Sequence, residues 1–499
     1  MRAGCQTESE GGCRRARQPH VLTRADFVTR TIAGALAATC PVARVAVAAQ
    51  APASSTPLDS SGASDASASA SDSASASAEP DVARSAARDG RDGLRMLVAT
   101  DMHFLSPRLT DHAACFERTI RASDAKCMEY SEQIMDALVW TILRERPDVV
   151  AVTGDLTYNG AVQSHEDFVA KMDPVRAAGI PVLVIPGNHD VDCPQAARFS
   201  GDGYEPVQSL SGEQFSQLYA AYGYDDAIAR DDASLSYVWQ APDERLTAGV
   251  PVRFLFVDCN AVQTPGTLPA RTLAWVGDQL ADARAAGAQV LAFSHQSVLQ
   301  QAFIAESFSI NNADDLRDLY DAAGVRMNFS GHLHCQHYAT DGAGLTDVAT
   351  ESLAVSPNLY ALVDVRPAED AGLTLAYRTA SLDVAGWARE RGSDDPDLLD
   401  FPTYARDFFR SASGMTTADD LVAAGRDERE AREMVDYITD VNQAWFAGRV
   451  DLLDVRPDLN DAWAQQSALV GLYLDYVFNQ TPVRDENVVE ARLGETGAR

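Results

Sequence analysis

Five short motifs concentrate the histidine, aspartate and asparagine side chains that could bind divalent metal ions. In chain order they are Asp101-Met-His103, Gly154-Asp155, Gly187-Asn188-His189-Asp190, Ser294-His295 and Gly331-His332-Leu-His334. Six of the nine histidines of the chain lie in these motifs or within three residues of them. Carboxylate, amide and imidazole ligands of this kind suit two divalent cations held about 4 Å apart. The motifs therefore predict a dinuclear metal centre.

The spacing within the motifs indicates how the side chains could meet. Alternate residues of an extended segment point the same way, so Asp101 and His103 can face one metal together. His332 and His334 can reach the same cluster for the same reason. Asp155 stands alone after its apolar run, which makes it the natural carboxylate to bridge two ions. The glycines of the motifs would let the backbone turn sharply and approach the ions closely.

Apolar runs precede the motifs and must position them. Such runs, rich in Val, Ile, Leu and Phe, lie at 95–100, 149–153, 182–185, 254–257, 290–293 and 325–329. Helical patterns lie among them at 130–146, 162–178, 212–222, 270–287 and 312–322. This alternation predicts a layered α/β fold with at least partly buried sheets. Ligands of open α/β sheets bind beyond the carboxyl ends of the strands, which is where the polar motifs fall.

The combined motif set resembles the calcineurin-like metallophosphoesterase superfamily over residues 95 to about 380. The resemblance implies an α/β/β/α sandwich and a hydrolase of phosphoesters that uses two divalent ions, of Mn, Fe, Zn, Co or Ni. One ion would be bound by Asp101, His103, Asp155 and His334, and the other by Asp155, Asn188, His295 and His332. His189 would act beside the scissile phosphate as general acid or charge stabiliser, while a metal-bridging hydroxide attacks phosphorus.

Two motif details bear on the substrate. The D-x-H opening and the GDLxxNG form resemble class III cyclic-nucleotide phosphodiesterases, including secreted bacterial members with a helical C-terminal domain, so we expect a small phosphodiester such as a cyclic nucleotide. Gly154-Asp155-Leu-Thr-Tyr158 also matches the GDxxY pattern of purple acid phosphatases, in which the tyrosinate binds iron. Those enzymes normally lack a histidine at the position of His103, so we interpret Tyr158 as a neighbouring or packing residue. A phosphomonoesterase or nucleotidase of the same superfamily, and a non-catalytic surface binding protein, are the alternatives.

The charge of the chain excludes other partners. The chain has 41 basic and 72 acidic residues, for a formal net charge of −31. Residues 1–93 carry ten of each sign, so the excess negative charge belongs to residues 94–499. Such a surface repels nucleic-acid backbones and anionic membranes, and we expect no nucleic-acid partner. No apolar stretch after residue 60 is long enough to span a bilayer, so no membrane span is expected in the mature chain. The oligomeric state stays open.

Composition divides the chain into four expected parts. Residues 1–51 place arginines before an Ala-rich apolar run, the order of an export signal, and could otherwise be a disordered tail. Residues 52–93 are a Ser/Ala/Asp-rich linker. Residues 94–382 form the metallophosphoesterase domain, and residues 383–499 form a C-terminal helical domain with patterns at 401–447 and 460–482. We expect an exported, cell-surface or extracellular protein, or a cytoplasmic one if the start of the chain is mis-assigned.

Some further side chains have open interpretations. Cys115 and Cys127 flank a polar insert and could form a disulfide outside the cell, which the sequence does not establish. Four tyrosines, Tyr204, Tyr219, Tyr222 and Tyr224, could stack on a base, although such spacing is more typical of packing on one helix face.

Overall fold

The computed structural model describes residues 93–301, 308–369, 372–412, 416–480 and 482–494. The expected export segment, residues 1–51, and nearly all of the linker, residues 52–93, therefore lie outside the described residues. None of the described helices is long and apolar enough to cross a membrane.

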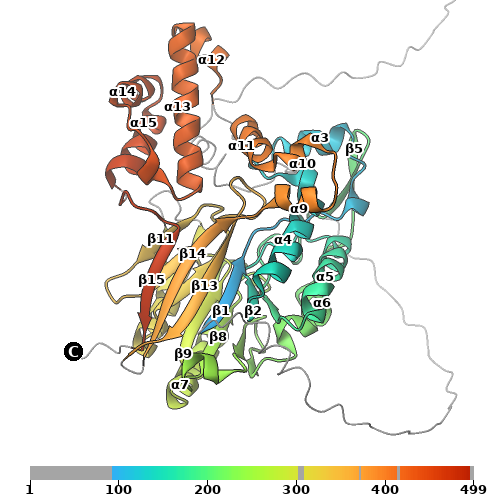
Figure 1. The fold of residues 1–499 in the computed structure, drawn as a ribbon, viewed down its shortest axis with the longest axis vertical. Coiled ribbons are helices and arrows are strands. Elements are labelled where there is room, and N and C mark those ends of the chain that lie inside the picture. Colours follow the sequence, from blue (N-terminus) through green and yellow to red (C-terminus); the bar gives the residue numbers. More distant parts are fainter. Residues whose placement is uncertain (1–92, 302–307, 370–371, 413–415, 481, 495–499) are drawn as a thin grey trace, which may run out of the picture.

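A six-stranded sheet forms one half of the centre of the molecule, in the order β15-β14-β13-β1-β2-β3 (Figure 1). Its strands are β1 Leu94–Ala99, β2 Val149–Val152, β3 Val182–Val184, β13 Leu359–Pro367, β14 Leu373–Ser381 and β15 Val488–Leu493. β1, β2 and β3 run parallel, and β13, β14 and β15 extend the sheet in antiparallel fashion. The three parallel strands confirm the first three apolar runs as strands, and each carries a motif at its carboxyl end.

A seven-stranded sheet forms the other half, in the order β11-β12-β10-β9-β8-β7-β6. Its strands are β6 Ala229–Arg230, β7 Tyr237–Gln240, β8 Val252–Val257, β9 Gln289–Ser294, β10 Met327–Ser330, β11 His337–Thr340 and β12 Thr346–Ala349. β8, β9 and β10 are parallel and confirm the last three apolar runs. A separate hairpin consists of β4 Ala197–Ser200 and β5 Gly203–Pro206.

Alternating side chains of the second sheet build a core on each of its faces. Phe254, Phe256 and Phe293 stack on one another in the core shared with the first sheet. Leu255 and Val257 point the other way, into a cluster with the helices α7 Ala270–Ala285 and α8 Ala313–Ala323. Helices α4 Ser131–Glu145 and α5 Val162–Ala177 pack against the first sheet (Figure 1). These layers confirm the α/β/β/α expectation.

The region after residue 383 is helical but not entirely so. Its helices are α9 Val384–Glu390, α10 Pro396–Leu399, α11 Phe401–Ala412, α12 Ala418–Ala423, α13 Glu428–Phe446, α14 Pro457–Gln466 and α15 Ala468–Asp475. The helical patterns at 401–447 and 460–482 are thus confirmed over the described residues, which leave out 413–415 and 481. Residues 488–493 instead form β15, which pairs with β14 at the edge of the first sheet (Figure 1).

The C-terminal helical domain expected over 383–499 is divided between two cores. Trp387 of α9 and Phe401 of α11 are buried in the core of the first sheet, whereas α13, α14 and α15 share a separate apolar cluster. The chain thus passes through the helical region and returns to the sheet. The reason is that residues Val488–Leu493 alternate between buried and exposed positions and can pair with the open edge of the sheet. That edge exists only in the tertiary structure.

Candidate metal centre

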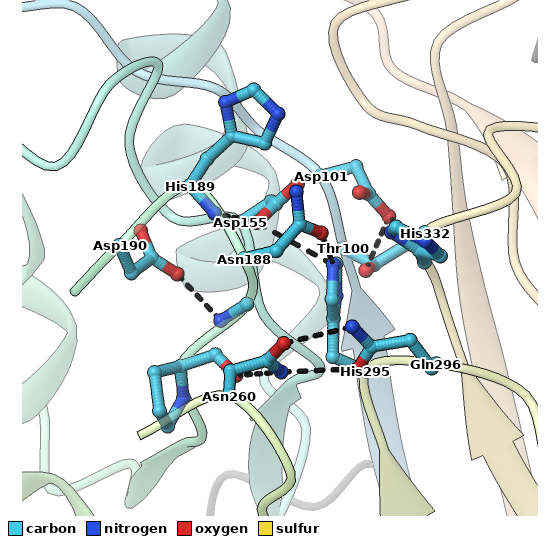
Figure 2. A network of polar contacts seen from close by, with 12 residues as sticks. Thr100, Asp101, Asp155, Asn188, His189, Asp190, Asn260, His295, Gln296 and His332 are labelled. Atoms are coloured by element: carbon cyan, nitrogen blue, oxygen red, sulfur yellow. Dashed lines mark hydrogen bonds and ion pairs between the residues drawn. The ribbon is translucent and has the colours of Figure 1, made fainter. Parts of the chain in front are cut away.

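Loops at the carboxyl ends of both sheets converge on one point (Figure 2). Asp101 follows β1, Asp155 follows β2, and Asn188 and His189 follow β3. His295 follows β9 in the second sheet, and the two histidines of the last motif follow β10. The structure therefore brings all eight candidate site residues to the same place, where the two sheets meet.

Four of these residues form a first group of potential metal ligands. One ligand atom from each of Asp101, His103, Asp155 and His334 lies within 4.8 Å of the others. Nε2 of His334 is 3.2 Å from Oδ1 of Asp101 and 3.0 Å from Nε2 of His103. All four side chains are buried. This group matches the ligand set that the family resemblance implies for one ion.

A second group shares Asp155 with the first. Asp155, His295 and His332 also place their ligand atoms within 4.8 Å of one another. Nε2 of His295 is 3.4 Å from Oδ1 of Asp155 and 3.0 Å from Oδ1 of Asn188. Oδ2 of Asp155 lies 3.7 Å from Nε2 of His103 on the opposite side. The two oxygens of one carboxylate thus face different groups, so Asp155 could be shared by two ions.

The two groups fit divalent cations by their chemistry. Oδ1 of Asp101 and Nδ1 of His103 are buried and have no hydrogen-bond partner among the described residues. Leaving a polar atom buried and unpaired costs free energy that a bound cation at Oδ1 of Asp101 would offset. The combined oxygen and nitrogen donors suit Mn, Fe, Zn, Co or Ni, and the described residues of the two groups include no cysteine.

Carbonyl oxygens orient two of the imidazoles. Nδ1 of His295 lies 2.8 Å from the carbonyl oxygen of Thr153, to which it can donate its proton. Nδ1 of His189 has the same relation to the carbonyl oxygen of Tyr158, also at 2.8 Å. A histidine that donates from Nδ1 keeps the lone pair of Nε2 free for a metal or a substrate. In both rings Nε2 is therefore the nitrogen available to a metal or a substrate.

Burial and neighbouring charges set the protonation of the ligands. Burial lowers the pKa of His103 well below its usual value and lowers the pKa of His332 to about 3, so both imidazoles are neutral. Burial raises the pKa of Asp155, but the charges of His295 and His189 outweigh burial and bring this pKa well below its usual value. Burial lowers the pKa of His295, yet Asp155 raises this pKa overall to about 9. A metal ion bound at Nε2 of His295 would therefore displace a proton.

The backbone of the ligand loops is strained. Five of the proposed metal ligands have positive φ angles: Asp101 at 49°, His103 at 43°, Asp155 at 47°, His332 at 64° and His334 at 58°. Residues other than glycine rarely adopt this left-handed region, and such strain persists where the surrounding structure enforces it. The spacing of the motifs gave no sign of these angles.

Asp190 is a site residue that the sequence interpretation left without a role. Its carboxylate accepts hydrogen bonds from the backbone N–H groups of Leu156, Thr157 and Gly187 at 3.1, 2.9 and 2.8 Å. Burial raises the pKa of Asp190 to about 7, against the effect of these donors. Asp190 therefore ties the loop after β3 to the loop after β2. Its place inside the GNHD motif was the available signal.

Other residues considered in the sequence lie at or outside the edge of the centre. The hydroxyl of Tyr158 lies 2.6 Å from Oγ of Ser123. Cys115 and Cys127 are buried free thiols, so the structure contains no disulfide between them. Three of the four tyrosines, Tyr219, Tyr222 and Tyr224, pack in the main core, whereas Tyr204 is 48% exposed.

A cavity of about 600 Å³ opens beside His189. One wall consists of Tyr158 and Asn159, and the other comes from α3 Ala114–Ile120, the turn after it and the β4–β5 hairpin. Lys126, which the sequence interpretation also missed, lines this cavity. The scarcity of lysine was the signal available in the sequence, because the chain has only two lysines.

Comparisons with known proteins agree with this architecture. Residues 94–336 match the family model of calcineurin-like phosphoesterases, and residues 383–477 match the model described as the C-terminal domain of cyclic nucleotide phosphodiesterase. A comparison with curated proteins gives no match.

Solved structures with a similar fold include two phosphatases. A dimetal phosphatase from Danio rerio is 15% identical, with a TM-score of 0.41, over 58% of this chain and 96% of the other. A purple acid phosphatase, PPD1, from seeds of yellow lupin (Lupinus luteus) is 17% identical, with a TM-score of 0.36, over 58% of this chain and 51% of the other. The family models confirm the motif resemblance: this chain carries a calcineurin-like phosphoesterase domain over residues 94–336 and a C-terminal domain of the cyclic nucleotide phosphodiesterase type over residues 383–477.

Proposed function

We propose that this protein is a phosphodiesterase that hydrolyses cyclic nucleotides or similar small phosphodiesters. The observation that carries the proposal is the pairing of the phosphoesterase domain with residues 383–477, which match the C-terminal domain of cyclic nucleotide phosphodiesterase. The phosphoesterase domain alone supports the reaction class, and the second match supports the diester class.

The residues of the centre have distinct roles in this proposal. Asp101, His103, Asp155 and His334 would hold one divalent ion, and Asp155, Asn188, His295 and His332 the other. When bound, the two cations supply Lewis-acid stabilisation of negative charge on the phosphoryl oxygens. Asp190 and the carbonyl oxygen of Thr153 hold the ligands in place, so the donor set is preorganised before substrate arrives.

His189 is the proposed acid or charge stabiliser. Its Nδ1 is engaged with the carbonyl oxygen of Tyr158, so Nε2 is the atom that can hold or move a proton at the substrate. The side chain borders both the ligand cluster and the cavity, with its ring centroid 4.9 Å from that of His103. From this position Nε2 can donate a proton to the leaving oxygen of a phosphoester, or stabilise negative charge on it, when the organic group of the ester occupies the cavity.

The size of the cavity favours a substrate with an organic group of nucleotide size. Pockets for small molecules commonly have volumes of about 300–1,000 Å³, and this one has about 600 Å³. Phe199 and Tyr204 on the hairpin side offer aromatic surface for such a group.

The test is the ester preference of the full-length chain after reconstitution with Mn. Initial rates would be measured on bis-p-nitrophenyl phosphate, p-nitrophenyl phosphate, and 2′,3′- and 3′,5′-cyclic nucleotides. We expect a preference for the diester and turnover of at least one cyclic nucleotide. Preference for the monoester would replace the proposal with a phosphomonoesterase or nucleotidase. Failure of the metal-replete protein to hydrolyse any of these esters would point to the binding-protein alternative.

A further inference from the structure

Lys126 is a buried cation with an incomplete set of partners. The chain has two lysines among its 41 basic residues, and the Lys126 residue is 1% exposed. Its ion-pair partner among the described residues is Asp124, whose Oδ2 lies 3.6 Å from Nζ. That separation exceeds the usual 2.7–3.2 Å of an N–H···O hydrogen bond. An ammonium group has three N–H donors, so this single long contact does not satisfy it.

The other lysine provides a contrast within the same chain. Lys171 lies on α5, where its Nζ is 2.6 Å from Oδ1 of Asp136 and 3.1 Å from Oε1 of Glu132. Lys171 therefore has two close carboxylate partners, although its side chain is more exposed than that of Lys126. The less well paired lysine is therefore the more buried one, and its side chain lines a cavity.

Lys126 lies beside the metal centre and not merely within the same domain. It lines the cavity together with His189 and Tyr158. His189 in turn borders the proposed metal ligands, with its ring centroid 4.9 Å from that of His103. One wall of the cavity that Lys126 lines is therefore a neighbour of the metal ligands.

The turn that carries Lys126 is fixed at both ends. The two residues before it, Asp124 and Ala125, adopt left-handed φ angles of 53° and 59°. Oγ of Ser123 lies 2.6 Å from the hydroxyl of Tyr158, and the N–H of Cys127 donates to the carbonyl oxygen of Ala354 at 2.7 Å. The backbone that carries Lys126 is therefore fixed on both sides of the residue.

We propose that the Lys126 ammonium binds a negatively charged phosphoryl oxygen of the substrate in the cavity beside His189 and so positions the phosphoester against the metal centre. A phosphoryl oxygen would supply the acceptor that the ammonium lacks. It would also give an anionic substrate a local positive charge in a chain whose net charge is −31. The inference rests on the proposed function for its setting, but it concerns the phosphoryl group that monoesters and diesters share.

The first test compares the same substitution at the two lysines in the full-length protein. Binding of inorganic phosphate to the Mn-reconstituted protein would be measured by calorimetry, with the metal content measured separately. We expect Lys126→Met to weaken phosphate binding about 10- to 100-fold while both metals stay bound, because a charge-assisted hydrogen bond is lost. Lys171→Met should bind phosphate as the unmodified protein does. A folded Lys126→Met protein with unchanged phosphate affinity would overturn the inference.

A second test needs no substitution at Lys126 and therefore survives a folding defect. ¹³C labelling of lysine Cε gives two side-chain NMR signals, because the chain contains two lysines, and Lys171→Met assigns them. In Zn-loaded protein, titration with inorganic phosphate should shift the Lys126 signal and leave the Lys171 signal in place. Phosphate binding that moves neither signal would contradict the inference.

The two proposals can fail separately. If the protein hydrolyses no diester but phosphate shifts the Lys126 signal, the proposed function fails and the role of Lys126 stands. If diesters are hydrolysed while Lys126→Met retains full phosphate affinity, the role of Lys126 fails and the proposed function stands.

Discussion

Asp155 joins the two halves of the metal centre through its two carboxylate oxygens. Oδ2 faces His103, and Oδ1 faces His295 and also accepts a hydrogen bond from the backbone N–H of His189 at 2.8 Å. One side chain thus connects ligands from both sheets. Loss of this carboxylate removes a ligand from each group, whereas loss of any other ligand affects one.

We therefore expect Asp155→Ala to lose both metal ions and all measurable turnover. The check is metal content by mass spectrometry after reconstitution, alongside hydrolysis of bis-p-nitrophenyl phosphate. Asp282→Ala is the control. Asp282 lies on α7, where its exposed side chain forms an ion pair with Arg253 of β8. An Asp155→Ala protein that still binds two metals would contradict the bridging role.

His189 differs from Asp155 because it lies beside the ligand groups and not within them. We expect His189→Ala to keep its metals and to lose about 10²- to 10⁴-fold in turnover, the usual effect of removing one acid or charge stabiliser. Steady-state kinetics on the preferred ester, with metal content measured on the same sample, provide the check. His112→Ala is a suitable control, since His112 packs on Phe116 at a ring distance of 5.0 Å. Full activity of His189→Ala would exclude the proposed role.

At the scale of elements, the loops after the strands depend on close backbone approach. A Cβ atom on Gly187 would overlap Oδ1 and the backbone nitrogen of Asp155, and one on Gly331 would overlap Oγ1 of Thr100 and Oδ2 of Asp101. Both glycines belong to the motifs, and both lie where one ligand loop crosses another. The parallel strands bring these loops together, and the absence of a side chain at Gly187 and Gly331 lets the backbones approach closely.

Gly187→Ala should accordingly disturb the centre, even though it adds one methyl group. We expect lower metal occupancy and at least about a tenfold loss of turnover, because a shift of about 1 Å at a catalytic group can cost 10²-fold. Gly342→Ala is the matched control, since a Cβ atom there would meet nothing within 4 Å. Equal metal content and turnover in the two variants would argue against the close-approach explanation.

The edge strand β15 offers a prediction about stability. Val489 is 6% exposed and faces the core, whereas its neighbour Val488 is 51% exposed. We expect Val489→Asp to lower the free energy of unfolding by more than about 2 kcal/mol, because it buries an unpaired charge. Val488→Asp should cost less than about 1 kcal/mol. Urea unfolding of both proteins measures the difference, and equal costs would contradict the register of β15.

At the scale of the whole molecule, the C-terminal helices support the last metal loop. Leu333 and Cys335, which flank His334, belong to the apolar cluster formed by α13, α14 and α15. The N–H of Gln336 donates to the carbonyl oxygen of Phe446 at the end of α13, at 2.8 Å. The helical region therefore shares its core with the loop that carries two metal ligands, which gives it a structural connection to the site.

A buried acid, Glu351, should impose a pH dependence on the stability of the whole fold. One of its oxygens accepts a hydrogen bond from the N–H of Leu359 at 2.9 Å, and the other has no hydrogen-bond partner among the described residues. Burial raises the pKa of Glu351 well above its usual value. The folded state therefore retains a proton that the unfolded state releases, and stability falls as the pH rises through the unfolded pKa of about 4.3 towards the folded value.

Glu351→Gln removes this titration and should stabilise the protein at neutral pH. We expect the free energy of unfolding of the parent to fall more between pH 5 and pH 8 than that of the variant. Denaturant unfolding of both proteins after metal removal isolates this effect from metal binding. Identical pH profiles would indicate that Glu351 is ionised in the folded state.

The sequence by itself indicated the reaction class through its motifs, singled out the eight candidate residues and predicted the central strands of both sheets. It could do so because these features are local: a polar motif directly follows an apolar run, and parallel strands bring their carboxyl ends to one edge. The tertiary structure decided how the motifs meet, including the left-handed angles of residues such as Asp101 and the use of Asp190 as a tie between loops. It also decided that Lys126 is buried beside the centre and that residues 488–493 complete a sheet. Both outcomes depend on segments distant in the chain, because the burial of a side chain and the pairing of an edge strand are set by what packs against them.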